Sequence, residues 1–363
     1  MQTRQRGSLA RRVSHVGLDV LLGLGDLLGR LPPGWGYAMS RGLGLAVFHL
    51  ARAERRKAMS HIAIAFPELS VSEHEAILRR CCQHLSWSGL EFAHLVHGGK
   101  DWVNSRIRVD GEQHVYAALA IGRGALYITG HIGNWEIQCA WAAQRMPLYP
   151  IARENASSGV TRRFLQVREH FGARSLLRER DQKTSVVRAA VEILSAGGVV
   201  GILMDQDLGG RGEFVPFFGK LAHTPGGPAL LALMTGAPVL FGFSYREGRD
   251  RRGSFHRVVY YPPYFAHPGI EPAEAQARGL ADPPTPLLAS RPEAAQVAPE
   301  DIHRYTAFFT ATIENAIRKA PEQWVWMHRR WRRQPSQHSP EATGPEAAPL
   351  AAAPTQTDQP EGR

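Results

Sequence analysis

Short apolar runs alternate with helical patterns from residue 103 onward, and this alternation constrains the fold most strongly. The apolar runs have the length and the β-branched or aromatic content of strands. They are residues 105–110, 125–130, 147–152, 199–205 and 238–244. Helical patterns lie at about 134–145, 158–171 and 184–196, and from residue 225 onward. Because strands separated by helices pair in parallel, we predict an α/β fold with a mostly parallel central sheet flanked by helices.

Capping signals mark two helix starts. Ser72 and Glu75 have the spacing of a capping box, so a long helix should begin near Ser72. Thr224 and Pro225 supply a cap and a first-turn proline for the helix expected from residue 225. Another helix is predicted to begin near Asp301, after a long loop over residues 265–300 that is rich in Pro and Ala.

Residues 1–59 form the first of three predicted parts. They contain an amphipathic pattern over 13–31, a Pro-Pro-Gly break, and an apolar run over 42–51 that is about half the length of a membrane span. We predict membrane-associated helices here, while an ordinary helix pair packed on the protein's own core stays an open alternative. Residues 60–334 form the main domain, and residues 335–363, with six Pro and few bulky apolar side chains, form a disordered tail.

The net charge of +10 is concentrated near the two ends of the sequence. Residues 1–59 carry +7, and residues 323–333 carry four Arg and no acid. Basic ends next to apolar sequence favour an anionic membrane surface over a nucleic acid. The three cysteines lack the spacing of a disulfide framework or a zinc site, so we predict no structural metal.

The candidate site lies at residues 125–141, where a hydrophobic strand leads into the Gly-flanked His131 and then into a helix that carries Glu136. Five residues apart on one helix the two side chains could not meet, but on a strand–turn–helix His131 can fold back over the first helical turn. A carboxylate on one ring nitrogen leaves the other free to take a proton from a hydroxyl. The alternative is that His131 only ends a strand and Glu136 is a solvated first-turn acid.

The motifs together resemble a known family, the lipid A biosynthesis late acyltransferases, which belong to the glycerolipid acyltransferase superfamily with its HxxxxD/E motif. The resemblance rests on ordered blocks over some 280 residues. These are RRKAMSHIAIAFPELS at 55–70, ITGHIGNWE at 128–136, IARENAS at 151–157, MDQDLGG at 204–210, VPFFGK at 215–220, HTPGGPALLALMTGAPVL at 223–240 and PEQWVWMHRRWR at 321–332.

The resemblance implies a glycerol-3-phosphate acyltransferase-like fold and an acyltransferase domain over residues 60–334. It implies transfer of a fatty acyl chain from acyl carrier protein or acyl-CoA to a hydroxyl of a glycolipid, without a cofactor. The site of action would be the cytoplasmic face of a bacterial inner membrane. A lipid A precursor is the expected acceptor, while mannosylated phosphoinositides, amino-acid lipids and a noncatalytic lipid-binding role stay open. A hydrolase is disfavoured because neither GxSxG nor HExxH occurs.

By position in the motif, His131 is the expected general base and Glu136 its orienting partner. Backbone N–H groups near Gly133 and Asn134 are candidates for stabilising the oxyanion. Weaker candidates complete the substrate site: Arg153 and Arg168 for a phosphate, Asp205 and Asp207 for orienting Arg153 or binding a sugar, and Phe217 and Phe218 for lining a channel.

The aromatic and basic segment over residues 324–333 has two readings. Tryptophans interleaved with arginines suit a bilayer interface, and they also suit a C-terminal segment that docks on the domain. The pattern could stack single-stranded nucleic acid, but no nucleic-acid module accompanies it, so we predict no nucleic-acid partner.

Overall fold

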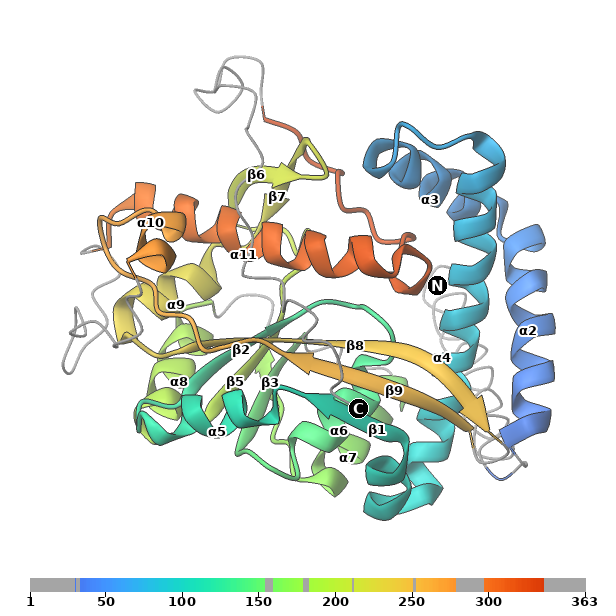
Figure 1. The fold of residues 1–363 in the computed structure, drawn as a ribbon, viewed down its shortest axis with the longest axis horizontal. Coiled ribbons are helices and arrows are strands. Elements are labelled where there is room, and N and C mark those ends of the chain that lie inside the picture. The colour runs from blue at the N-terminus through green and yellow to red at the C-terminus, as the bar shows by residue number, and fades with distance from the viewer. Residues whose placement is uncertain are drawn as a thin grey trace, which may run out of the picture.

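The computed structural model describes residue 30 and residues 33–153, 159–178, 183–210, 212–250, 253–278 and 297–335. A seven-stranded sheet in the order β1-β9-β8-β2-β5-β3-β4 forms its centre (Figure 1). All neighbouring pairs are parallel except β8–β9, which is antiparallel. The predicted mostly parallel sheet flanked by helices is therefore confirmed.

The strands of this sheet are β1 Ile107–Asp110, β2 Ala125–Thr129, β3 Leu148–Arg153, β4 Leu176–Arg178, β5 Val199–Leu203, β8 Val239–Asp250 and β9 Gly253–Tyr260. A separate antiparallel pair is formed by β6 Glu213–Phe217 and β7 Lys220–Thr224. The sequence patterns predicted β1, β2, β3, β5 and the first half of β8. They missed the other strands, because these are short or carry charged residues that conceal the pattern.

The helices are α2 Pro33–Leu50, α3 Arg52–Ala65, α4 Val71–Arg106, α5 Glu112–Ala120, α6 Trp135–Ala142, α7 Gly159–Phe171, α8 Lys183–Ser195, α9 Gly227–Thr235, α10 Pro272–Ala277 and α11 Pro299–Lys319. A short 3₁₀ turn follows at Pro321–Gln323. Figure 1 shows α9 and α11 over one face of the sheet, α5, α6 and α7 over the other, and α2, α3 and α4 at one end.

Strand β2 illustrates how the sheet divides the core in two. All five of its residues are buried, as expected of a central parallel strand that is covered on both faces. Leu126 and Ile128 join the cluster under α9 and α11, whereas Ala125 and Tyr127 join the cluster around α5, α6 and α7. The two-residue period of the strand therefore supplies both layers of the core.

Two predicted helix starts are corrected. Helix α4 begins two residues early, with Ser70 as N-cap and Glu73 completing the capping box. Helix α9 begins at Gly227 after the N-cap Gly226. Thr224 instead ends β7, where its hydroxyl is already engaged with a buried arginine, Arg330. A local cap motif places a helix start only to within a few residues when neighbouring side chains compete for the same role.

The N-terminal prediction is covered only in part. The amphipathic pattern over 13–31 lies outside the described residues except for its Arg30, and the apolar run over 42–51 lies mostly within α2. Among the described helices, none combines the length and apolarity that crossing a bilayer requires. Within the expected loop over 265–300, residues 272–277 form α10, and residues 279–296 lie outside the described part, as do residues 336–363 of the predicted tail.

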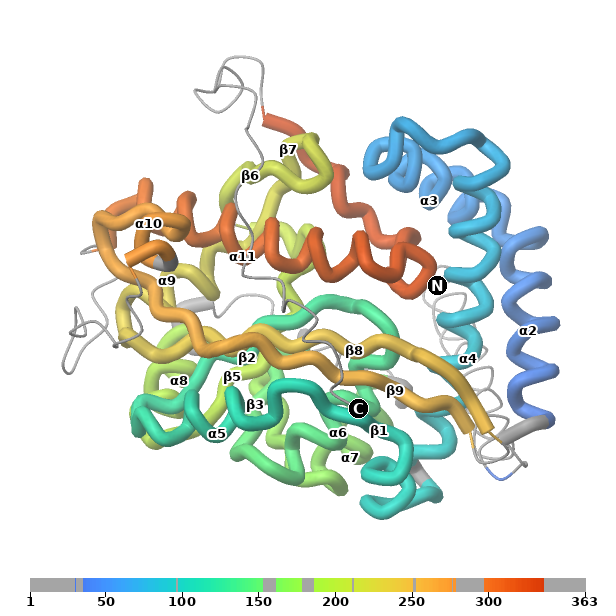
Figure 2. Tube along the Cα trace, viewed as in Figure 1, coloured from blue at the N-terminus to red at the C-terminus, as the bar shows by residue number. Residues whose placement is uncertain are grey.

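The long hairpin of β8 and β9 reaches from the sheet to the helical end of the molecule. Figures 1 and 2 show its far end lying beside the beginning of α2. There the Arg249 guanidinium lies 3.4 Å from the centroid of the Tyr37 ring. The hairpin therefore connects the central sheet with α2 and α4.

Candidate active site

His131 lies just past the carboxyl end of β2, on the turn before α6. Strands β2 and β5 pair in parallel with Thr129 opposite Leu203, so His131 and Asp205 each follow their strand by two residues. The carboxyl ends of adjacent parallel strands meet at one edge of the sheet, which is where ligand sites of such folds form. The register alone therefore brings these two side chains together.

Asp205 holds the ring and the backbone of His131. Its Oδ1 lies 2.8 Å from Nδ1 of His131, and its Oδ2 accepts a 2.8 Å hydrogen bond from the His131 backbone N–H. The indole N–H of Trp324 donates to the same Oδ2 at 2.7 Å. Burial by itself raises the pKa of the Asp205 carboxyl, but the neighbouring His131 and the two hydrogen bonds with it hold that pKa well below its usual range.

The remaining surroundings of the ring leave it partly open. The side chain of His131 is 19% exposed. The side-chain amide nitrogen of Gln206 lies 3.1 Å from each ring nitrogen of His131 and 2.6 Å from Nε2 of His328. Burial, with His131 as a second cause, lowers the pKa of His328 to about 4, so His328 is neutral at pH 7. The Trp135 ring packs edge-on against the His131 ring, with centroids 4.9 Å apart.

Glu136 pairs with Arg168, and the expected contact with His131 is not among the hydrogen bonds of the described residues. Oε1 accepts from Nη2 of Arg168 at 2.7 Å, and Oε2 accepts from Nε at 3.0 Å. Glu136 lies in the first turn of α6, and its side chain faces α7, which carries Arg168. The predicted partner of His131 is therefore corrected, because Asp205 and not Glu136 lies beside its ring. Arg168, which was predicted to bind a phosphate, pairs with the Glu136 carboxylate.

The two expected oxyanion donors have different surroundings. The backbone N–H of Gly133 donates to the Gln323 carbonyl at 3.0 Å, so it is corrected as a free donor. Gly133 has φ 61°, and a Cβ there would lie 2.2 Å from the Ser244 carbonyl oxygen, so only glycine fits. The Asn134 side chain caps α6 by accepting from two backbone N–H groups, and its Nδ2 donates to Glu91 at 2.8 Å.

Asp207 has its own partners among the described residues. Asp207 accepts from the Gly209 backbone N–H at 3.0 Å and pairs with Arg333. Arg153 is the last residue of β3, where its Cα pairs with that of Arg178 in β4, and its side chain lies outside the described part. The predicted orienting role of the two aspartates for Arg153 therefore stays a prediction.

Phe217 and Phe218 belong to the hydrophobic core, which corrects their prediction as channel-lining residues. The Phe217 ring packs against Trp324 and Trp331, with centroids 5.7 and 5.5 Å apart. Phe218 is the one non-glycine residue in the described chain with positive φ, and its backbone N–H donates to Glu314. The two consecutive phenylalanines therefore lie where β6 ends and the turn to β7 begins, and both side chains pack into the core.

The C-terminal tryptophans dock on the domain, which confirms one of the two readings of that segment. Trp324, Trp326 and Trp331 are buried. Arg330 is also buried: it donates to the His223 carbonyl at 2.8 Å, and burial lowers its pKa to about 10. This segment supplies Trp324 and His328 to the site around His131.

Sequence reasoning missed two residues of the site, Gln206 and His328, and it missed the orienting role of Asp205 toward His131. The equal distance of His131 and Asp205 from the ends of two adjacent strands was a signal that could have paired them. The sequence carried no comparable signal for His328, which comes from a segment almost 200 residues away and reaches the site only through the packing of the tryptophans. Among the described residues no group of three or more His, Cys, Asp or Glu side chains could hold a metal ion.

A histidine after a parallel strand, held by a buried carboxylate and partly open to solvent, is typical of enzymes that take a proton from a substrate hydroxyl. The fold and the site together are those of an α/β enzyme with a histidine–carboxylate centre. The chain belongs to the bacterial lipid A biosynthesis acyltransferase family, whose sequence profile matches residues 10–333. This confirms the resemblance seen in the sequence motifs.

Two kinds of relatives are similar to the chain. The lipid A biosynthesis lauroyltransferase of Escherichia coli is 24% identical over 82% of this chain and 86% of its own length. The phosphatidylinositol mannoside acyltransferase of Mycobacterium tuberculosis is 34% identical over 39% of this chain. The second match spans 45% of that protein, so the chain aligns with less than half of the mannoside acyltransferase.

Proposed function

We propose that this protein transfers a fatty acyl chain from an acyl thioester to a hydroxyl of a glycolipid. The observation that carries the proposal is the partly exposed His131 with a buried aspartate on Nδ1, in a chain of an acyltransferase family. The acyl donor is acyl carrier protein, or acyl-CoA. The acceptor is a lipid A precursor, and the support is that the relatives matched over most of the chain are named for lipid A biosynthesis.

The reaction uses His131 as the general base. Asp205 fixes the tautomer with the proton on Nδ1, so Nε2 takes the proton of the acceptor hydroxyl while the oxygen attacks the thioester carbonyl. A carbon–oxygen bond forms, the carbon–sulfur bond breaks, and His131 passes the proton to the leaving thiolate. The negative charge on the carbonyl oxygen needs donors, and the candidates are the Gln206 amide, 3.1 Å from the His131 ring nitrogens, and the backbone N–H of Asn134.

The place of action is the cytoplasmic face of a bacterial inner membrane. Support comes from α2, whose exposed large apolar side chains recur every three or four residues and so form one stripe: Trp35, Met39, Leu43, Val47 and Leu50. A helix with an apolar face and an aromatic residue at its end is typical of segments that lie in the bilayer interface. We define these five residues as the α2 stripe.

Purified full-length protein tests the proposal in detergent micelles with acyl carrier protein thioesters and a lipid A precursor, with the product detected by mass spectrometry. His131→Ala should lower turnover at least about 100-fold, because a positioned general base contributes roughly 10²–10⁴-fold. The matched control is His303→Ala, a partly exposed histidine on α11 that is not part of the site around His131. Equal turnover in wild type and His131→Ala, with every donor and acceptor pair, would leave a noncatalytic lipid-binding role.

A second candidate acceptor is a mannosylated phosphoinositide. The observation that favours it is the higher identity, 31–34%, to the mycobacterial phosphatidylinositol mannoside acyltransferases over the matched part. Amino-acid lipids form a third arm of the same assay. Supplying each acceptor separately with one donor decides among them, since the acceptor with the largest kcat/KM is the one that the site stabilises in the transition state.

A further inference from the structure

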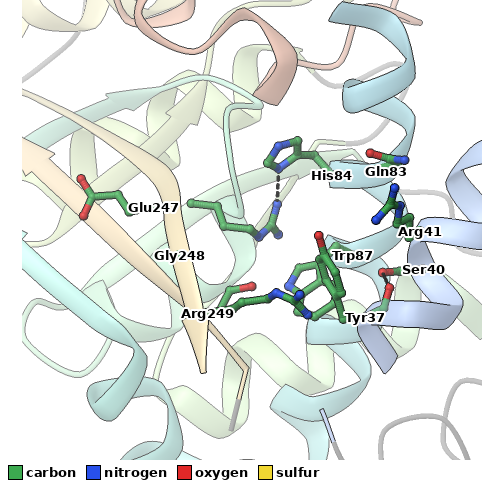
Figure 3. Close-up of a pocket in the computed structure, with 11 residues that line it drawn as sticks. Tyr37, Ser40, Arg41, Gln83, His84, Trp87, Glu247, Gly248 and Arg249 are labelled. Atoms are coloured by element: carbon green, nitrogen blue, oxygen red, sulfur yellow. Dashed lines mark hydrogen bonds between the residues drawn. The ribbon is translucent and has the colours of Figure 1, made fainter. Parts of the chain in front are cut away.

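A second site lies between α2, α4 and the far end of β8. It is a cavity of 260 Å³ to which α2 contributes Tyr37 and Arg41, α4 contributes His84, and β8 contributes Arg246 and Arg249 (Figure 3). His131, Asp205, Gln206 and His328 do not line it. The cavity is smaller than the roughly 300–1,000 Å³ of pockets for drug-sized ligands, so it suits a headgroup fragment and not an acyl chain.

A β-bulge places two arginines of β8 on the same side. The register of β8 and β9 shifts between Arg246 and Gly248, so Arg246 pairs with His256 and Arg249 pairs with Ser254. Residues three apart on a regular strand face opposite sides, whereas the bulge lets both arginines face the helices: Arg246 contacts α4 and Arg249 contacts Tyr37 of α2. Glu247, the residue inside the bulge, also lines the cavity. Its Oε1 lies 3.5 Å from Nη1 of Arg257, and Figure 3 shows the carboxylate apart from the other labelled side chains.

The cavity has an excess of positive charge. Arg246 is balanced by Glu91, at 2.6 Å, and also donates to Nδ1 of His84 at 2.7 Å. Its Nε is buried without a hydrogen-bond partner among the described residues. Arg41 and Arg249 have no carboxylate within ion-pair distance in the part of the chain that the structure describes. A buried guanidinium N–H that lacks an acceptor and two unbalanced guanidinium groups are the features that an anion would satisfy.

We propose that this cavity binds the phosphate group of an anionic lipid headgroup. Guanidinium groups match phosphate oxygens in a bidentate geometry, and this favours phosphate over a neutral sugar. The lipid source follows from α2, which carries Arg41 into the cavity and the exposed α2 stripe on its outer side. The choice of a lipid headgroup over a free phosphate rests on the membrane association proposed above. Phosphate binding in this cavity does not depend on the proposed acyl transfer.

The cavity also connects to the turn that carries His131. Nη2 of Arg246 donates to the Ser88 hydroxyl at 3.0 Å, and this hydroxyl lies 3.3 Å from the Gly133 carbonyl oxygen. Glu91 bridges Arg246 and Asn134, the N-cap of α6. A phosphate bound at Arg246 would therefore hold the lipid beside α2 and α4, next to the turn that carries His131.

Flotation of the full-length protein with vesicles tests the site. The vesicles are phosphatidylcholine alone or phosphatidylcholine with phosphatidic acid, without any acyl donor or acceptor. Arg41→Gln and Arg249→Gln should each weaken the preference for phosphatidic acid about fivefold, the loss expected for one basic residue at an anionic surface. The matched control, Arg188→Gln on the exposed face of α8, should retain it. An equal loss in all three variants would indicate general surface charge and overturn the proposal.

Two further measurements distinguish this proposal from binding of a free phosphate and from the proposed acyl transfer. Free glycerol 3-phosphate should compete with the vesicles only weakly, and saturable binding of it without any preference for phosphatidic acid vesicles would overturn the lipid assignment. His131→Ala should bind these vesicles as the wild type does. Acyl transfer can therefore fail while the headgroup site stands, and vesicle preference can be lost while transfer stands. Unfolding midpoints in urea that match the wild type would show that both arginine variants are folded.

Discussion

Asp205 is buried, charged and bound to three donors, and each of these properties bears on what His131 can do. A carboxylate in this position keeps the imidazole in one orientation and one tautomer. It also stabilises the imidazolium that forms once the ring has taken a proton. The backbone bond from His131 to the same carboxylate fixes the turn, so the ring and its support move together.

Asp205→Asn is expected to lower kcat about 100- to 10,000-fold, because the amide keeps the size of the side chain but removes the charge that orients and stabilises the ring. Steady-state kinetics over a pH range provide the measurement, with KM changing much less than kcat. Asp207→Asn is the matched control, because Asp207 lies two residues after Asp205 in the sequence and pairs with Arg333. A kcat for Asp205→Asn within a few-fold of the wild type would assign the activation of His131 to another residue.

The Glu136–Arg168 ion pair is predicted to stabilise the fold. Both side chains are largely buried, so Glu136→Gln leaves a guanidinium without its charge partner and should lower the free energy of unfolding by about 3 kcal/mol. Arg168→Gln should cost a similar amount. The double variant should cost less than the sum of the two, which a double-mutant cycle in urea measures.

One result would restore Glu136 to the reaction. If Glu136→Gln abolished turnover while its unfolding free energy stayed at the wild-type value, the carboxylate would act on substrate or on His131. Arg168→Gln serves as the comparison, because a purely structural pair predicts that both single variants lose stability and turnover to the same extent.

At the scale of elements, the crossing of α2 and α4 depends on one glycine. A Cβ on Gly44 would lie 2.6 Å from Cα of Gln83 in α4, closer than real side chains approach backbone. Gly42, two residues earlier on the same helix, has no neighbour within 4 Å of its Cβ position. Alanine substitutions at the two glycines therefore distinguish the effect of close helix packing on stability from the effect of helix propensity.

Gly44→Ala should push α2 away from α4 and lower the free energy of unfolding by about 1–3 kcal/mol, the range for overpacking a close contact. Gly42→Ala is expected to raise it by roughly 0.5–1 kcal/mol, because alanine favours the helix. Urea unfolding of both variants provides the measurement. If the two substitutions changed stability in the same direction by the same amount, the packing of α2 on α4 would be wrong.

At the scale of the whole molecule, partly buried neutral histidines make stability depend on pH. Burial, with Arg246 as the next cause, lowers the pKa of His84 to about 3, and burial lowers that of His328 to about 4. In the unfolded chain both groups titrate near 6.5. The unfolded state therefore binds more protons between pH 6.5 and 4, and stability that is fully present above pH 6.5 is lost as the pH falls through this window.

His84→Gln should flatten this dependence. Each histidine contributes a slope of at most about 1.4 kcal/mol per pH unit, so the variant should lose up to that much of the slope between pH 6 and 4.5. Glutamine keeps an oxygen that can accept from Arg246. The measurement is the free energy of unfolding in urea at a series of pH values, and identical slopes in the variant and the wild type would contradict the assignment.

The sequence by itself determined the layers of the fold and the location of the candidate catalytic histidine. Apolar runs alternating with helical patterns define a parallel sheet because each strand must be covered on both faces, and His131 stands at the end of such a strand. The motif blocks also indicated the family, which the match over residues 10–333 confirms. These features are local, so spacing along the chain is enough to find them.

Only the tertiary structure decided which side chains meet. His131 pairs with Asp205 and not with the nearer Glu136, because the register of β2 and β5 aligns residues 74 positions apart, while the first turn of α6 directs Glu136 toward α7. His328 arrives through the packing of distant tryptophans, and the bulge in β8 faces two arginines the same way. Hydrogen bonds depend on distances in space, and separation along the chain fixes these only within one element.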